Sequence, residues 1–434
     1  MKQLLPLSVI VLLVLAHVET GIGDALRPLS RPEMQTLPAP LSILRGVPSD
    51  DRPYFKKPGP EPAILILRGI GVALLVSLVV CVLLAGDGRS GRAASSVITG
   101  LLVLTLYAIP ASVPIVARAR THDPALAHDG GTIQIEVASG MLLAGKNPYR
   151  ETYRGTPLES WRGLETPIVE HFPYFPWALL PLVPAVALGV ADLRIVYALF
   201  LLGTAILLAI PARRHETRLA LFCLPFFAPL LAKATMLGTN DAYAIFWIVA
   251  ALFAIERGWH RSGLALLGLA FAVKQFSWLL APLLLAVLWK ERDRRVLLLA
   301  PAAFLAVTLP FALWDPASFL DDTFGYGLGG SATMHPVKGV GAYGFGNIAL
   351  AFGLVRTPND PFPYTSIGIA ICAAILALGA RRLHRTPSIA AIPALFAAAL
   401  LPLLYFARYL HANFLGYAVF FLLWGALRQD PDAP

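Results

Sequence analysis

Residues 94–116 read ASSVITGLLVLTLYAIPASVPIV, and the chain then turns polar over residues 117–131, ARARTHDPALAHDGG. The first stretch is one of many apolar runs that approach the roughly 20 residues a helix needs to cross a bilayer. Backbone polar groups in lipid must be satisfied within a helix or a closed barrel. A barrel would show alternating segments of about ten residues, whereas these runs are continuous. The sequence therefore predicts an all-α polytopic membrane protein with about 11–12 transmembrane helices.

Composition supports this class and excludes others. The chain has 434 residues, of which 57% are hydrophobic and 14% charged, whereas soluble domains are about half apolar and a quarter charged. The net charge of +9 comes from short Arg-rich clusters between apolar runs, which are typical of cytoplasmic loops. We therefore expect membrane lipids, and no nucleic acid, as partners. The three cysteines form no CxxC pair, so neither a disulfide framework nor a zinc site is indicated.

The basic clusters also predict the topology, because short cytoplasmic loops retain Lys and Arg. They place two long polar loops on the outer face, residues 118–173 and 315–346. The apolar stretch 174–190 contains three prolines, so we expect an irregular interfacial or re-entrant element there. The predicted organisation is a signal-like segment or short anchor (1–16), a Pro-rich extracytoplasmic linker (17–62), the membrane domain (63–428) and a cytoplasmic tail (429–434).

Charged residues within or beside membrane spans are costly and are candidates for function. The predicted topology brings acids and bases from several distant segments to the outer face. Ordinary interfacial charge and snorkelling are the alternative explanation for any one of them. The candidates are Asp123, Asp129, Lys146, Tyr149, Asn240, Asp241, Lys274, His335, Lys338, Arg408 and His411.

Asp129 is the candidate general base. A carboxylate outside the bilayer suits removal of a proton from an incoming hydroxyl, and Gly130 and Gly131 would permit close approach of a substrate. The alternative is that Asp129 caps the helix that follows. Asp123 precedes Pro124, a pair more typical of a turn.

The other candidates also have structural alternatives. Gly145-Lys146-Asn147-Pro148-Tyr149 predicts a helix end, with a possible substrate contact at Tyr149. Asn240-Asp241 opens an apolar run and can cap a helix. Lys274 lies between two short apolar segments, where packing does not explain a lysine. With His335, Lys338, Arg408 and His411, it would suit an anionic lipid phosphate, for which Arg is the best bidentate partner.

In these residues the chain resembles the GT-C superfamily, which comprises membrane glycosyltransferases that use polyprenyl-phosphate sugars. Within the superfamily it resembles most the mannosyltransferase-like members grouped as glycosyltransferase family 87. The resemblance runs in order over residues 121–289. The family pattern has an Asp in the first outer loop, a helix with a Gly-x-Asn-Pro-Tyr-like end, a Tyr-Pro-Pro-like element, an Asp-led span and a Gly-rich helix ending in Lys. Here these read Asp129, Gly145–Tyr149, Tyr174-Phe175-Pro176, Asn240-Asp241 and residues 263–274. Phe175 stands where the family has a proline, and Asp123 competes with Asp129.

The resemblance implies a GT-C-like fold and an inverting sugar transfer outside a bacterial cytoplasmic membrane. Asp129 would deprotonate an acceptor hydroxyl, and Asp241 would orient donor or acceptor groups. Lys274 and Arg408, with His335 or Lys338, would stabilise the departing phosphate. The implied partners are a polyprenyl-phosphate sugar, mannose by family default, and a lipid or glycan acceptor. No cofactor beyond the lipid-linked donor and no metal is expected.

Two other classes of function remain open. A transporter or flippase of lipid-linked precursors would also need phosphate-binding cations, but it would not need a base beside an acceptor. A non-catalytic membrane scaffold would tolerate substitution of the outer charged residues. Fold analogy alone does not decide among the three.

Overall fold

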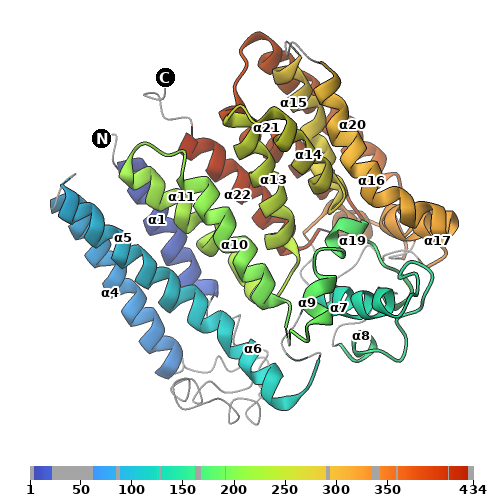
Figure 1. Cartoon of the computed structure of the whole chain (residues 1–434), viewed down its shortest axis with the longest axis horizontal. Helices are drawn as coiled ribbons and strands as arrows, with labels where there is room; N and C mark the ends of the chain where they lie inside the picture. Colours follow the sequence, from blue (N-terminus) through green and yellow to red (C-terminus); the bar gives the residue numbers. More distant parts are fainter. Residues whose placement is uncertain are drawn as a thin grey trace. The chain divides into compact units, whose positions relative to one another are not determined.

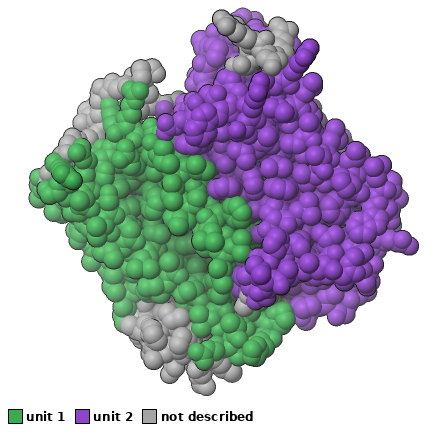
Figure 2. Space-filling model, in the orientation of Figure 1, with its two compact units in different colours: residues 1–132, 194–242 green, residues 133–193, 243–434 purple. Residues whose placement is uncertain are grey.

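The computed structural model describes residues 4–21, 62–84, 88–124, 126, 129–161, 168–190, 192–289, 294–333, 343–357, 360–408 and 410–428. All regular structure in these residues is helical (Figure 1), which confirms the predicted class. The chain divides into two compact units, coloured separately in Figure 2. Unit 1 comprises residues 1–132 and 194–242, and unit 2 comprises residues 133–193 and 243–434. His335, Lys338, most of the predicted linker and the predicted tail lie outside the described residues.

Unit 1 is built from apolar helices. Its elements are α1 (Leu4–Ala16), η1 (His17–Gly21), α4 (Pro62–Leu84), α5 (Arg89–Val103), η3 (Leu104–Ala108), α6 (Ile109–Thr121), α10 (Arg194–Ala209), α11 (His215–Phe227) and α12 (Leu231–Met236). The elements α5, η3 and α6 form one uninterrupted helical run of 33 residues. A π-helical turn at η3 and Pro114 within α6 are both features that bend a helix. This run contains the apolar stretch 94–116 predicted as a span.

The first helix belongs to the apolar core of unit 1. The buried positions Leu7, Ile10 and Val14 recur at helical spacing and so form one stripe, and α1 packs against α11. One turn further, the buried His17 donates from Nε2 to the carbonyl of Leu106 at 2.9 Å. The signal-like segment of the sequence therefore contributes packing to this unit.

The packing of α1 predicts how two apolar substitutions on the same helix differ. Ile10 is 0% exposed and Leu12 is 67% exposed. We expect Ile10→Ala to lower the free energy of unfolding by roughly 2 kcal/mol or more, because it leaves a cavity. Leu12→Ala should change it by less than about 0.5 kcal/mol. Thermal unfolding of the two purified variants in one detergent measures the difference, and equal losses of stability would contradict the packing.

Unit 2 holds the remaining helices, most of the first loop predicted to be outside (from residue 133 on) and the second one. Its elements are α7 (Gly130–Leu143), α8 (Pro157–Ser160), η4 (Ile168–Glu170), η5 (Pro176–Ala178), α9 (Val183–Ala187), α13 (Asp241–Glu256), α14 (His260–Phe271), η6 (Gln275–Leu279), α15 (Leu280–Leu288), η7 (Arg294–Leu298), α16 (Leu299–Trp314), α17 (Pro316–Leu320), η8 (Asp321–Gly325), α18 (Tyr326–Leu328), α19 (Phe345–Ala351), α20 (Tyr364–Arg385), η9 (Ile389–Ala391), α21 (Ile392–Tyr405) and α22 (Ala412–Arg428). The division between the units falls within the first turns of α7 and α13.

Close helix packing in unit 2 explains the Gly-rich run that precedes Lys274. A Cβ on Gly268 would lie 2.2 Å from the carbonyl oxygen of Ala300, and one on Gly263 would lie 2.5 Å from the side chain of Ile255. Both positions therefore require glycine so that α14 can approach α16 and α13. Close packing at a glycine is also seen at Gly425 of α22, where a Cβ would lie 2.8 Å from the Cβ of Ala394 in α21. These contacts hold α14 close to its neighbouring helices, and Lys274 follows the end of α14.

Helix length and composition support membrane insertion. Four helices are long and apolar enough to cross a bilayer: residues 65–84, 89–121, 295–314 and 364–385. Six shorter apolar helices accompany them among the described residues. The stretch 174–190 is broken into η5 and α9, as its prolines predict. The number of transmembrane crossings stays a prediction.

Candidate functional site

The start of α7, at Asp129, lies beside the turn that leads to Asp241 in unit 1. The backbone N–H of Asp129 donates to the carbonyl of Leu237 at 2.8 Å, and the hydroxyl of Thr132 donates to the carbonyl of Gly238. These bonds place the start of α7 beside the turn that precedes α13. Two helix starts more than a hundred positions apart in the sequence are thus joined by hydrogen bonds.

The turn before α13 buries polar side chains. Gly238 has a φ of +87°, a left-handed conformation that favours glycine, and this allows the chain to reverse before Asn240. Asn240 and Asp241 are both buried. Among the described residues, Asn240 Nδ2 and Thr239 Oγ1 have no hydrogen-bond partner. Buried polar atoms without partners are costly, so this turn has a donor and a hydroxyl that a polar ligand would satisfy.

Asp129 fills the capping role that the sequence offered as one of two interpretations, and its role as a base stays a prediction. Its Oδ1 accepts a hydrogen bond from the N–H of Gly131 at 2.9 Å, so the carboxylate caps α7. The side chain is partly exposed, which allows the carboxylate to meet a substrate as well. Asp123 is exposed and follows the left-handed residue His122 (φ +55°) at the end of α6, consistent with a turn.

Lys274 lies in an aromatic cage in unit 2. Its Nζ sits 5.6 Å from the ring centre of Phe276, 5.7 Å from that of Phe414 and 5.5 Å from that of Tyr417. The residue is 7% exposed and occupies the extended position between α14 and η6. Cation–π contacts stabilise an ammonium that has lost water. The cage therefore holds a buried positive charge at the end of a helix.

Arg408 and His411 lie in the segment between α21 and α22. Arg408 is buried, with its guanidinium 6.0 Å from the ring centre of Tyr364. It packs so tightly on Gly329 that a Cβ there would meet Arg408 Cδ at 3.0 Å. The ring of His411 lies 6.2 Å from that of Phe414, which belongs to the cage. Burial lowers the pKa of His411, so at neutral pH it is a neutral hydrogen-bonding group rather than a cation.

Tyr149 and Lys146 follow the end of α7, where Gly145 adopts a φ of +73° as the predicted helix stop requires. Tyr149 is buried, and its hydroxyl donates to the carbonyl of Tyr174 at 2.8 Å. Its ring contacts those of Phe172 and Phe319. Tyr149 therefore packs within the first outer loop and against α17. Lys146 is largely exposed and pairs with Glu151 at 3.4 Å.

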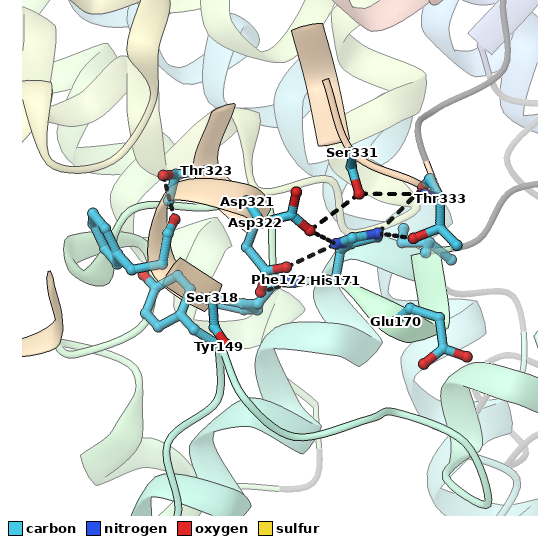
Figure 3. Close-up of polar contacts among 12 residues, drawn as sticks. Tyr149, Glu170, His171, Phe172, Ser318, Asp321, Asp322, Thr323, Ser331 and Thr333 are labelled. Carbon is cyan, nitrogen blue, oxygen red and sulfur yellow. Dashed lines mark hydrogen bonds and ion pairs between the residues drawn. The ribbon is translucent and has the colours of Figure 1, made fainter. Parts of the chain in front are cut away.

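A further polar cluster joins the two outer loops and was not predicted from the sequence. His171 Nδ1 donates to Asp322 Oδ1 at 2.8 Å, and the N–H of Phe172 donates to Asp322 Oδ2 at 2.8 Å (Figure 3). Nearby, Gln275 Nε2 donates to the carbonyl of Thr323 at 2.8 Å, which links this cluster to the residue after Lys274. The only hint in the sequence was that His171 and Asp322 fall in loops predicted to share a face.

The pKa values of His171 and Asp322 are both raised above their ordinary values. Burial by itself lowers the pKa of His171, but the hydrogen bond to Asp322 and the charges of Asp322 and Asp321 outweigh it, so the net shift raises the pKa. Burial raises the pKa of Asp322, against the opposing hydrogen bonds from His171 and Phe172. The two shifts therefore have different causes: the neighbouring acids for the pKa of His171, and burial for the pKa of Asp322.

The double acceptor role of Asp322 predicts a graded loss of stability. Asp322→Ala leaves two buried donors without an acceptor, each worth about 1–3 kcal/mol, so we expect a loss of roughly 2–4 kcal/mol. Asp322→Asn keeps one carbonyl oxygen as an acceptor and should lose less. Thermal unfolding in buffer with EDTA compares the two variants. A Tm for Asp322→Ala equal to that of the wild type would refute this role.

Comparison with known proteins identifies the family. The family model described as glycosyltransferase family 87 matches residues 167–428, which is more than half of the chain. The chain belongs to glycosyltransferase family 87. No curated protein and no solved structure matches it.

Membership in family 87 makes the protein a membrane glycosyltransferase. The matched region contains Asn240, Asp241, Lys274, Arg408 and His411, together with the pair His171 and Asp322. Asp129 and the helix end at Gly145–Tyr149 precede it. Lys274, Arg408 and His411 therefore lie in the part of the chain that matches the family, whereas the role of Asp129 as a base stays a prediction.

Proposed function

We propose that this glycosyltransferase moves a sugar from a polyprenyl-phosphate donor to a lipid or glycan acceptor, with inversion, at the outer face of a bacterial cytoplasmic membrane. The observation that carries the proposal is the buried Lys274 in its aromatic cage. A charged side chain buried in a membrane protein is a candidate for function by default. An anionic phosphate on an apolar lipid chain satisfies both the ammonium and the aromatic rings.

In the proposed reaction Asp129 removes the proton from an acceptor hydroxyl. The hydroxyl oxygen then forms a bond to the anomeric carbon of the donor as the bond from that carbon to the phosphate oxygen breaks. The lipid phosphate leaves with the electron pair, and Lys274 and Arg408 stabilise its charge as it develops. Asn240 and Asp241 orient hydroxyl groups, using the amide donor that is left without a partner. Mannose is the sugar expected from the family resemblance.

The alternative function is transport of a lipid-linked precursor, which the same cations would support. Transfer requires a base and transport does not, so Asp129→Asn separates them. We expect this variant to lose about 10²–10⁴-fold in transfer rate while its affinity for the donor stays near that of the wild type. Asparagine retains a capping oxygen, so the fold of α7 should be kept.

The measurement is transfer of radiolabelled sugar from a panel of polyprenyl-phosphate donors to membrane lipid extract. Asp123→Asn is the matched control, because Asp123 lies in the same loop and is exposed. Loss of transfer in Asp123→Asn alone would make Asp123 the base. No transfer by any folded form, wild type included, would favour the transporter.

The role of Lys274 predicts a selective effect on the donor. We expect Lys274→Gln to raise KM for the donor or to lower kcat by roughly tenfold or more, since a charged hydrogen bond to phosphate is worth about 1.5–3 kcal/mol. Arg154→Gln is the control, because Arg154 is an exposed cation that pairs with Glu159 and Glu170. Steady-state kinetics at varied donor concentration compare them, and equal effects of the two substitutions would argue against a phosphate contact at Lys274.

A further inference from the structure

His171, Asp321 and Asp322 form a compact group of potential metal ligands in unit 2. One donor atom from each residue lies within 4.8 Å of the other two. His171 Nδ1 is 2.8 Å from Asp322 Oδ1 and 3.7 Å from Asp321 Oδ2. When ligand atoms bind an ion at a distance of about 2.1 Å, neighbouring ligand atoms lie about 3 Å from each other. The distances from His171 Nδ1 to the two carboxylate oxygens lie on either side of that value. The three donor atoms are thus already near the spacing that an ion requires.

The outer contacts of these residues match those that orient metal ligands. Metal-bound histidines donate their second ring nitrogen to an oxygen, and metal-bound carboxylates accept further hydrogen bonds. Here His171 Nε2 lies 2.6 Å from Thr333 Oγ1 and 3.2 Å from the Thr333 carbonyl. The hydroxyl of Ser331 donates to Asp321 Oδ2 at 3.0 Å, and the N–H of Phe172 holds the second oxygen of Asp322. Figure 3 shows these groups converging on the imidazole.

Charge balance is a separate argument for a bound cation. Among the residues that the structure describes, His171 is the only basic side chain that pairs with Asp321 or Asp322. Within the described residues two carboxylates thus lie beside one imidazole, and Asp322 is buried. Even with a doubly protonated ring the group would keep a net negative charge. A divalent cation, with a neutral imidazole and two carboxylates, would bring the group to neutrality.

We propose that His171 Nδ1, Asp321 and Asp322 bind a divalent metal ion of the Mn²⁺ or Zn²⁺ type, which accepts one nitrogen and two carboxylate ligands. The ion would tie the end of the first outer loop to η8. Three protein ligands leave positions for water or for an oxygen of a bound phosphate. The ligands come from positions 151 residues apart, so no local spacing in the sequence indicated a metal. This site does not depend on the proposed sugar donor.

The test is Mn²⁺ binding by the full-length protein in detergent, after EDTA treatment and with neither donor nor acceptor present. Electron paramagnetic resonance of free Mn²⁺ gives the affinity and stoichiometry. We expect the wild type to bind one ion per chain, and Asp321→Asn to bind it at least about 10-fold more weakly. Asp315→Asn should bind like the wild type, because Asp315 lies in the same loop but caps α17, a role that asparagine also fills.

Two controls keep the result interpretable. Thermal unfolding in EDTA checks that Asp321→Asn folds, which the half-exposed side chain of Asp321 favours. Spin-echo spectra of bound Mn²⁺ should show coupling to a directly bound nitrogen, as coordination by His171 requires. No binding by the wild type, equal affinity for Asp321→Asn, or no nitrogen coupling would each overturn the metal site. Sugar transfer is assayed separately, so its absence would bear only on the proposed reaction.

Discussion

Within a bilayer the hydrogen-bonding groups of the backbone have no water to meet, so they must be satisfied inside each helix. This constraint gives the chain its all-helical form and also determines where chemistry can occur. Polar side chains are tolerated where helices end, because there the backbone itself needs partners. Asp129 and Asp241 stand at the starts of α7 and α13, Lys274 follows α14, and Arg408 lies between α21 and α22. The candidate residues therefore occupy the places that the scaffold leaves polar.

Charge is distributed differently in the two units. In unit 1 the Asp129 carboxylate accepts from a backbone amide, and Asp241 is buried after the buried Asn240. In unit 2 aromatic rings surround the ammonium of Lys274 and face the guanidinium of Arg408. Rings stabilise a cation without neutralising it, whereas a carboxylate would compete with an incoming phosphate. Each of these two buried cations therefore has aromatic rings as part of its immediate surroundings.

Local rules explain which parts of the fold were predictable. The helix stop at Gly145, the broken element at residues 174–190 and the long helix over residues 89–121 follow from glycine, proline and apolar length. The capping role of Asp129 was one of two interpretations, and the structure shows it without removing the other. His171 and Asp322 were not assigned a role, because either residue alone resembles ordinary loop polarity. Their significance comes from a contact across 151 positions of the sequence.

The sequence by itself determined the helical class, the membrane setting and the residue types available at the outer loops, since these depend on composition and on spacing within single segments. Only the tertiary structure decided which distant segments meet: Leu237 with Asp129, the α22 rings with Lys274, and Asp322 with His171. Hydropathy constrains each helix against lipid, but it does not specify which helix becomes its neighbour. Neighbours are chosen by close packing, as where Gly268 admits the backbone of α16, and by the burial of polar groups that only a partner from another segment can satisfy.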